Sequence, residues 1–315
     1  MSLSFSVLMA NYNNGKYIKD AINSILAQTY KNWELIIVDD ASTDNSVEIV
    51  ESIARSDHRV KLFINSKNRN CGYAKHRAAK MASGDILGYL DPDDTLEINA
   101  LEEMKNCHES RPDIGLIYSS HYICDEDLNI KRLAYAAEKI PENENYLTHG
   151  KGVTHFATFK RKCYLKTTGI NPYFKRAVDQ DLYYKLEEVC TLYFLNKPLY
   201  KYRIHEGGIS TLKNLSKSRY WFVKAKHDAY LRRKSLKHIK NISKKELNAW
   251  YSILYVSKAS DSLKRKNILK MFCWIILSIL KSPIDKYFIL KLKTLFLNTR
   301  FHKLYKFAIS KSFKE

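Results

Sequence analysis

Glycine and proline are scarce in this sequence, with 10 and 6 residues in a chain of 315. Together with 45% hydrophobic residues, this scarcity is typical of a folded chain and argues against long disordered stretches. The six cysteines form no CxxC pair, which predicts a reduced, cytoplasmic protein with free thiols. No run reaches about 18 apolar residues, so no membrane-spanning helix is expected. The first residues, MSLSFSVLMANYNN, have no basic leader and predict a strand rather than a signal peptide.

Two common nucleotide-binding motifs are also missing. The chain has no GxxxxGK(S/T) phosphate loop, and its first turn, ANYNNGKY, contains a single glycine. Dinucleotide binding by an oxidoreductase needs a glycine-rich first turn, because the pyrophosphate closely approaches the backbone there. The sequence therefore argues against both of these classes.

The excess of positive charge lies in one part of the chain. Residues 1–215 contain 28 Lys and Arg and 28 Asp and Glu, out of totals of 53 and 33. Residues 216–315 therefore hold 25 basic and 5 acidic residues, which is the whole net charge of +20. This asymmetry predicts two domains, 1–215 and 216–315, with different partners.

Strands and helices alternate in the first part of the chain. Apolar runs at 5–10, 33–40, 60–65 and 85–90 predict strands, with helices between them. Such alternation predicts an α/β fold with a mostly parallel sheet covered by helices on both faces. After about residue 114 the pattern is mixed. Strands are expected in IGLIYSSHYI, HFATFK, TLYFL and PLYKYRI, and a short helix in DLYYKLEEV.

Polar clusters follow three of these strands, at the sheet edge where ligands bind in such folds. They are Asn11–Asn13, Asp39–Asp40 and the acids of LDPDD at 90–94. Asp91 and Asp93 share one side of an extended chain, and carboxylates suit Mg²⁺ or Mn²⁺, which keep further positions for phosphates. The alternative is that these acids cap the following helix and favour its dipole.

Four longer runs share a resemblance to a known family. They are SVLMANYNNGKYIKDAINSILAQTYKNWELIIVDDASTDNS, GYAKHRAAKMASGDILGYLDPDD, AVDQDLYYKL and YKYRIHEGGIS. In this order they resemble the family 2 glycosyltransferases of the GT-A fold, over roughly residues 4–210. The resemblance implies an inverting enzyme that moves a sugar from a nucleotide donor, preferably UDP-linked, to a glycan or lipid-linked acceptor in surface polysaccharide synthesis.

The resemblance also implies roles for individual residues. The implied nucleotide-binding residues are Ala10, Tyr12, Asp40, Lys75, Asp91, Arg203 and Ser210. The implied ligands of Mn²⁺ or Mg²⁺ are Asp93, Asp91 and His205, and the implied general base is Asp179. Lys75 replaces an arginine of the family pattern, which loses the planar fork, and Val178 replaces a glutamate. Asp181 is the alternative base, or a cap of its helix.

A competing class is a non-catalytic protein that keeps the fold and binds a nucleotide or nucleic acid. The presence of Asp93, Asp179 and Arg203 together favours the enzyme, because a protein that only binds has no use for a general base.

The last hundred residues do not resemble the catalytic motifs. MFCWIILSIL and YFILKLKTLFLNTRFHKLYKFAI mix apolar and aromatic residues with Lys and Arg, which is typical of a helix in a membrane interface. We therefore expect an anionic membrane surface as partner, and a peripheral location at the inner membrane face. A solvated helical bundle, a dimer contact and nucleic-acid binding are the alternatives.

Overall fold

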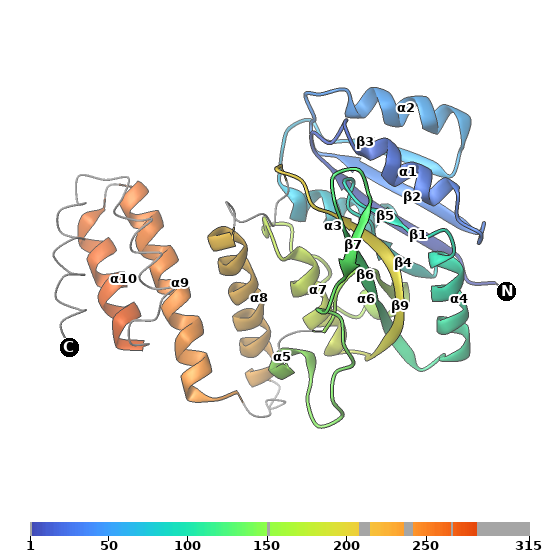
Figure 1. Ribbon diagram of the computed structural model, residues 1–315. Coiled ribbons are helices and arrows are strands. Elements are labelled where there is room, and N and C mark those ends of the chain that lie inside the picture. The colour runs from blue at the N-terminus through green and yellow to red at the C-terminus, as the bar shows by residue number, and fades with distance from the viewer. Residues whose placement is uncertain (1, 150–151, 208–214, 236–241, 266, 282–315) are drawn as a thin grey trace. The chain divides into compact units, whose positions relative to one another are not determined.

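The computed structural model describes residues 2–149, 152–207, 215–235, 242–265 and 267–281. The chain divides into two compact units, Met1–Leu212 and Lys213–Glu315. Strands and helices make up the first unit, and helices make up the described part of the second (Figure 1).

The first unit begins with alternating strands and helices, as predicted. Their order is β1 Phe5–Asn11, α1 Ile18–Leu26, β2 Trp33–Asp39, α2 Ser46–Ser56, β3 Val60–Ile64, α3 Cys71–Met81 and β4 Ile86–Tyr89. The four strands pair in parallel in the order β3-β2-β1-β4. The register sets Asn11 opposite Asp39, so the polar residues that follow β1 and β2 meet at one edge of the sheet.

Alternate side chains of the central strands face opposite layers of helices. Val7 and Met9 of β1 share a core with Ile18 and Ile22 of α1. On the other face α3 packs against β1 and β2, with small buried residues such as Ala78 at the contact. Helices on both faces explain why these strands are almost wholly apolar.

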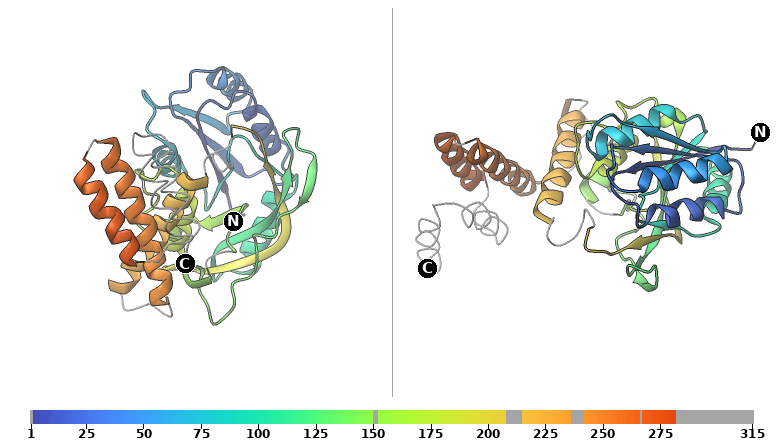
Figure 2. Two further views of the ribbon diagram at one scale, coloured as in Figure 1. Left: turned by 60° about the vertical axis from the view of Figure 1, so that its left-hand side comes forward. Right: turned by 90° about the horizontal axis from the view of Figure 1, so that it is seen from above.

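The remainder of the first unit extends the same sheet. Its elements are β5 Thr95–Leu96, α4 Ala100–Ser110, β6 Ile114–Cys124, β7 Ile130–Leu133, α5 Tyr146–His149, β8 Ala157–Lys160, α6 Arg161–Tyr164, α7 Val178–Glu187 and β9 Thr191–Arg203. The sheet continues from β4 through β8, β6 and β9 to β5, and β7 pairs with β6. β6 and β9, distant in the sequence, run side by side in parallel (Figure 1, Figure 2).

The prediction of two separate strands between residues 191 and 204 was wrong, since a single long strand, β9, occupies this segment. The register against β6 shifts on both sides of Ser120, which pairs with Pro198. Proline has no N–H to donate to a ladder, and a local irregularity accommodates it. The end of β9 pairs with β5, which directly follows LDPDD, so Arg203 and His205 come close to these acids.

The described helices of the second unit are α8 Leu215–Ser235, α9 Lys244–Lys264 and α10 Ile268–Lys281. The Ser243 hydroxyl accepts from the Glu246 amide at 3.1 Å and caps the start of α9. Val256 and Ala259 of α9 form a small core with Met271 and Ile275 of α10. Within the described residues, no helix combines the length and the apolar character needed to cross a membrane.

Candidate active site

Asp39, the last residue of β2, links the end of β1 to the loop that follows β2. Its carboxylate accepts from the Ser42 amide at 2.8 Å, the Ser42 hydroxyl at 2.6 Å and Asn11 Nδ2 at 2.7 Å. Three donors fix this carboxylate in the turn. Asp39 therefore shapes the edge of the site rather than facing a ligand.

Asp40, which directly follows β2, is buried. Asp40 Oδ1 accepts from Asn65 Nδ2 at 2.7 Å, and Oδ2 accepts from the Arg69 amide at 2.9 Å. Each carboxylate oxygen has a second lone pair for another donor. Ala10 lies near the end of β1, and the side chain of Tyr12 is about half exposed.

Lys75 and Asp91 form an ion pair at the end of β4. Lys75 Nζ lies 2.8 Å from Asp91 Oδ1, with the lysine side chain buried and the aspartate partly exposed. Burial tends to raise the pKa of Asp91, but the neighbouring ammonium outweighs it, and the pKa is lowered. Burial likewise opposes the charge of Lys75, but Asp91 holds its pKa well above the usual range. Both groups are therefore charged near neutral pH.

The thiol of Cys71, at the start of α3, marks the place where the predicted residues converge. Burial raises the pKa of this thiol to about 11, and the charges of Lys75, Asp91, Asp179 and Asp40 all act on it. The four groups come from the ends of β2 and β4 and from helices α3 and α7. Four predicted residues are thus close enough to one thiol to act on its charge.

Asp93 pairs with His205 across the site. His205 Nε2 donates to Asp93 Oδ2 at 3.0 Å, and the Asp93 side chain retains 24% of its exposure. Two ligands about 2.1 Å from a divalent ion in adjacent octahedral positions are themselves about 3.0 Å apart. The separation of these two atoms therefore also matches two adjacent ligands of Mn²⁺ or Mg²⁺, and the Asp93 side chain is partly exposed. Within the described part of the chain, no three His, Cys, Asp or Glu side chains form a metal site by themselves.

Asp94, the third acid of LDPDD, supports β9 instead. Its carboxylate accepts from the Tyr200 hydroxyl at 2.6 Å and from the Arg203 amide at 2.7 Å. Burial, together with the charges of Asp93 and Asp91, raises the pKa of Asp94 well above the usual range. The three acids therefore have three different partners, and only two of them face the site.

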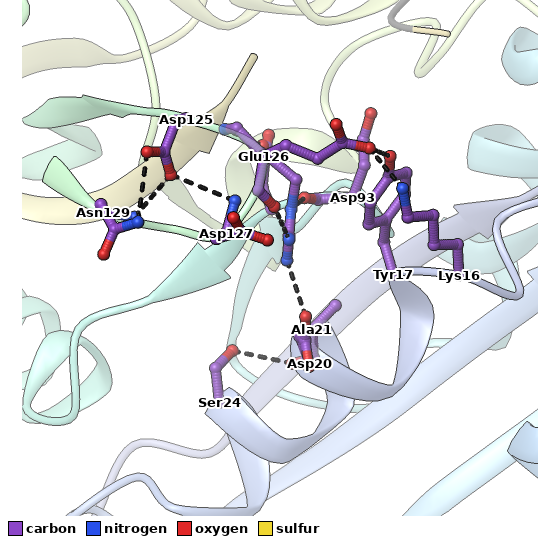
Figure 3. Close-up of polar contacts among 12 residues, drawn as sticks. Lys16, Tyr17, Asp20, Ala21, Ser24, Asp93, Asp125, Glu126, Asp127 and Asn129 are labelled. Carbon is purple, nitrogen blue, oxygen red and sulfur yellow. Dashed lines mark hydrogen bonds and ion pairs between the residues drawn. The ribbon is translucent and has the colours of Figure 1, made fainter. Parts of the chain in front are cut away.

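Arg203 contacts Tyr17, Asp20 and Glu126, three residues that Figure 3 labels. Arg203 Nη2 lies 2.8 Å from Asp20 Oδ2, and Nε donates to the Asp93 carbonyl at 2.7 Å. The guanidinium also donates to the Glu126 carbonyl and stacks 4.7 Å from the centre of the Tyr17 ring. In this arrangement Arg203 holds the backbone of Asp93. Its predicted contact with a diphosphate stays a prediction.

Sequence reasoning missed Tyr17, Asp20 and Glu126. Tyr17 donates to Glu126 Oε1 at 2.5 Å, and Lys16 bonds to the same oxygen (Figure 3). The Tyr17 ring also packs against the ring of His205, with the two ring centres 4.6 Å apart. These partners are more than a hundred residues away in the chain. The only available signal was the i, i+3 placement of Tyr17 and Asp20 at the start of α1.

The structure distinguishes the two candidate bases on α7. Asp181 Oδ2 lies 2.6 Å from Lys185 Nζ in a buried pair whose side chains are 2% and 7% exposed. Lys185 also donates to the Gly169 carbonyl at 2.8 Å. Asp179 is half-buried, lies in the first turn of α7 and acts electrostatically on Lys75. Asp181 therefore has a structural partner, whereas Asp179 lies close enough to Lys75 to act on its charge. Ser210 lies outside the described residues.

Comparisons with known proteins show what this chain is similar to. Residues 6–168 match the family described as "Glycosyl transferase family 2". A chondroitin synthase of Escherichia coli is 32% identical over 212 residues, which span 67% of this chain but 30% of that protein. The E. coli protein "UDP-Glc:alpha-D-GlcNAc-diphosphoundecaprenol beta-1,3-glucosyltransferase WfgD" is 30% identical over 69% of this chain and 84% of its own length.

Two solved structures have a similar fold. S. aureus TarS in complex with UDP-GlcNAc has a TM-score of 0.60 at 16% identity, over 90% of this chain and 93% of the other. A mannosyltransferase of Pyrobaculum calidifontis in complex with GDP-Man and Mn²⁺ has a TM-score of 0.55 at 14% identity. This likeness covers 91% of this chain and 88% of the other. These likenesses confirm the predicted GT-A fold of the first unit.

Proposed function

The chain belongs to glycosyl transferase family 2, and we propose that it moves a sugar from a UDP-linked donor to a hydroxyl of a glycan or lipid-linked acceptor, with inversion. The family makes the protein a glycosyltransferase, which favours catalysis over the non-catalytic alternative. The observation that best supports the proposal is the 3.0 Å separation of Asp93 Oδ2 and His205 Nε2, which fits adjacent ligands of one divalent ion.

Asp93 and His205 would hold Mn²⁺ or Mg²⁺. When bound, such an ion neutralises the charge that develops on the departing diphosphate. Arg203 Nε bonds to the Asp93 carbonyl at 2.7 Å, and this contact keeps Asp93 in position. Asp91 is already paired with Lys75, so we propose that it contacts the ribose of the donor rather than the metal ion.

The donor pocket would be built from the ends of β1 and β2. Asp40 would accept from the N–H of uracil with a remaining lone pair, and Ala10 and Tyr12 would lie against the base. The Lys75 ammonium, kept cationic by Asp91, would favour the diphosphate electrostatically. UDP is preferred because TarS was solved with UDP-GlcNAc and the name of WfgD specifies UDP-Glc. Ser210 keeps its predicted role beside the diphosphate.

Asp179 would act as the general base. Its carboxylate takes the proton of the acceptor hydroxyl as that oxygen bonds to the anomeric carbon, and the bond from this carbon to the nucleoside diphosphate breaks. General-base catalysis contributes about 10²–10⁴-fold. One displacement from the face opposite the leaving group inverts the anomeric carbon. Asp179 can serve because Gln180 Nε2 contacts its carboxylate only at 3.4 Å, whereas the carboxylate of Asp181 is paired with Lys185 at 2.6 Å.

A lipid-linked acceptor is supported by WfgD, whose name specifies a sugar on diphosphoundecaprenol. A growing polysaccharide is the related possibility supported by the chondroitin synthases. Both acceptors present a sugar hydroxyl, so the chemistry at Asp179 is the same.

The experiment that tests this function measures nucleotide release from UDP-sugars with Mn²⁺, with and without acceptor sugars, and determines the anomeric configuration of the product by NMR. We expect acceptor-dependent UDP release and an inverted product. Asp179→Asn should lower transfer by about 10²–10⁴-fold and leave UDP affinity almost unchanged. A product of retained configuration, or an active Asp179→Asn variant, would contradict the proposal.

A further inference from the structure

Helix α10 is apolar on its outer side as well as on its inner side. Met271, Ile275 and Ser278 are buried against α9, and the Ser278 hydroxyl donates to the Ser252 carbonyl at 3.0 Å. On the opposite side, large apolar side chains are exposed: Leu269 by 79%, Leu280 by 74% and Ile276 by 56%. Contiguous exposed apolar patches of this kind mark interaction sites in folded proteins.

The exposed side chains form a continuous surface, the outer face of α10. A period of 3.6 residues aligns Phe272, Ile276 and Ile279 in one stripe. It aligns Leu269, Cys273 and Leu280 in the adjacent stripe, and all of these residues are exposed. The outer face is therefore a second apolar side of the helix, in addition to the one that packs on α9.

Basic residues border this outer face. Lys270 and Lys281 are exposed and lie in one stripe, between the outer face and the side that contacts α9. Nζ of Lys258 in α9 lies 4.5 Å from the centre of the Trp274 ring, and Nζ of Lys281 lies 5.7 Å from the centre of the Tyr251 ring. An apolar face bordered by cations and aromatic rings suits the boundary between acyl chains and anionic headgroups.

The length of α10 determines how it can meet a bilayer. Its 14 residues span about 21 Å, short of the roughly 30 Å of a hydrocarbon core. Over its described residues, the helix is therefore long enough to lie in the interface but too short to cross the hydrocarbon core. The charge of the C-terminal hundred residues favours an anionic surface over a second copy of the chain. Residues 216–315 hold 25 basic and 5 acidic residues, so a second copy would be repelled while an anionic surface attracts. The segment 282–315 is also basic, with 8 Lys and Arg residues and 2 Asp and Glu residues.

We propose that the outer face of α10 inserts into the interface of an anionic lipid bilayer and anchors the enzyme to it. The inference goes beyond the proposed function and does not depend on the residues proposed for catalysis, so vesicle binding can succeed or fail independently of sugar transfer. An enzyme held in this way meets a lipid-linked acceptor by diffusion along a surface rather than through the bulk.

The first test uses the unaltered full chain. Cys273 is exposed within the outer face, so its alkylation rate reports directly whether that face is covered. We expect vesicles of phosphatidylglycerol and phosphatidylcholine to slow alkylation of Cys273 several-fold, with no effect on partly buried Cys71, read by mass spectrometry. Bound vesicles that leave the rate at Cys273 unchanged would overturn the proposal. So would slow alkylation without vesicles, which would mean that a second copy or residues 282–315 cover the face.

The second test compares vesicle co-sedimentation of matched variants. Leu269→Glu with Ile276→Glu puts two negative charges on the outer face, and should weaken binding about 25-fold, at about 1 kcal/mol per charge near the surface. The control is Ile98→Glu with Leu165→Glu, which alters two exposed apolar residues of the first unit and should have no effect. Lys270→Gln should weaken binding about fivefold on the same basis. Equal binding of both double variants, or equal binding to pure phosphatidylcholine vesicles, would refute the proposal.

Discussion

Replacing either acid of α7 by its amide should separate catalysis from folding. Asp179→Asn and Asp181→Asn make the same chemical change two residues apart on one helix. Asp181 and Lys185 are 2% and 7% exposed and 2.6 Å apart, so water does not screen the pair. Removing one partner of such a buried pair costs about 3–5 kcal/mol, because the other charge is left uncompensated. Asp179 is half-buried, and its amide should cost little stability.

Thermal unfolding and transfer assays on both variants check this prediction. About 3–5 kcal/mol corresponds to a melting temperature lower by roughly 6–20 °C for a unit of this size. Asp181→Asn should show that loss and, below its melting temperature, retain transfer. Asp179→Asn should melt like the unaltered protein and lose transfer. Asp181→Leu with Lys185→Met removes both charges and should recover much of the stability. An inactive but stable Asp181→Asn variant, beside an active Asp179→Asn variant, would refute the assignment.

Three further predictions follow from other polar contacts. Glu34 has a pKa of about 2, because Lys61, Ser6 and Ser83 outweigh its burial. The lowered pKa of Glu34 contributes about 3 kcal/mol to the free energy of unfolding, fully present above pH 4.5 and lost as the pH falls toward 2. Glu34→Gln should therefore make the stability depend less on pH in this range. A urea midpoint of the unaltered protein that does not change between pH 6 and pH 3 would contradict this. Asp20→Asn should raise the Mn²⁺ concentration needed for half-maximal transfer several-fold, because Arg203 loses the carboxylate that orients it. The control is Lys19→Gln on the same helix, which should leave this concentration unchanged. Lys75→Met should weaken UDP binding about tenfold while Lys75→Arg retains most of it, and equal affinity in a calorimetric titration would rule out a charge effect.

The sequence predicts the first half of the fold well because its strands are apolar runs separated by helical periodicity. The parallel register then brings Asn11 and Asp39 together, as expected from the common edge of parallel strands. β9 was harder, because Pro198 in the middle of a 13-residue strand resembles a break and is accommodated only by the irregular pairing with β6.

The candidate site shows the same limit of sequence reasoning. LDPDD predicts charge at one place, but not that Asp94 would support β9 while Asp93 meets His205. Tyr17 and Glu126 were missed because their contacts depend on a chain that returns after more than a hundred residues. The local sequence pattern therefore indicated where the site lies, whereas the role of each acid depends on contacts with residues distant in the sequence.

The most direct measurement is thermal stabilisation of the protein by UDP, GDP, dTDP and CDP, each with and without Mn²⁺. A ligand at one hundred times its Kd adds about 2.7 kcal/mol, or roughly 5–11 °C for a unit of this size. We predict that UDP stabilises strongly only with Mn²⁺, that Asp93→Ala abolishes the metal's effect, and that Asp127→Ala, a nearby acid outside the site, retains it. Equal stabilisation with and without Mn²⁺, or an unaffected Asp93→Ala variant, would contradict a metal–diphosphate site at Asp93 and His205.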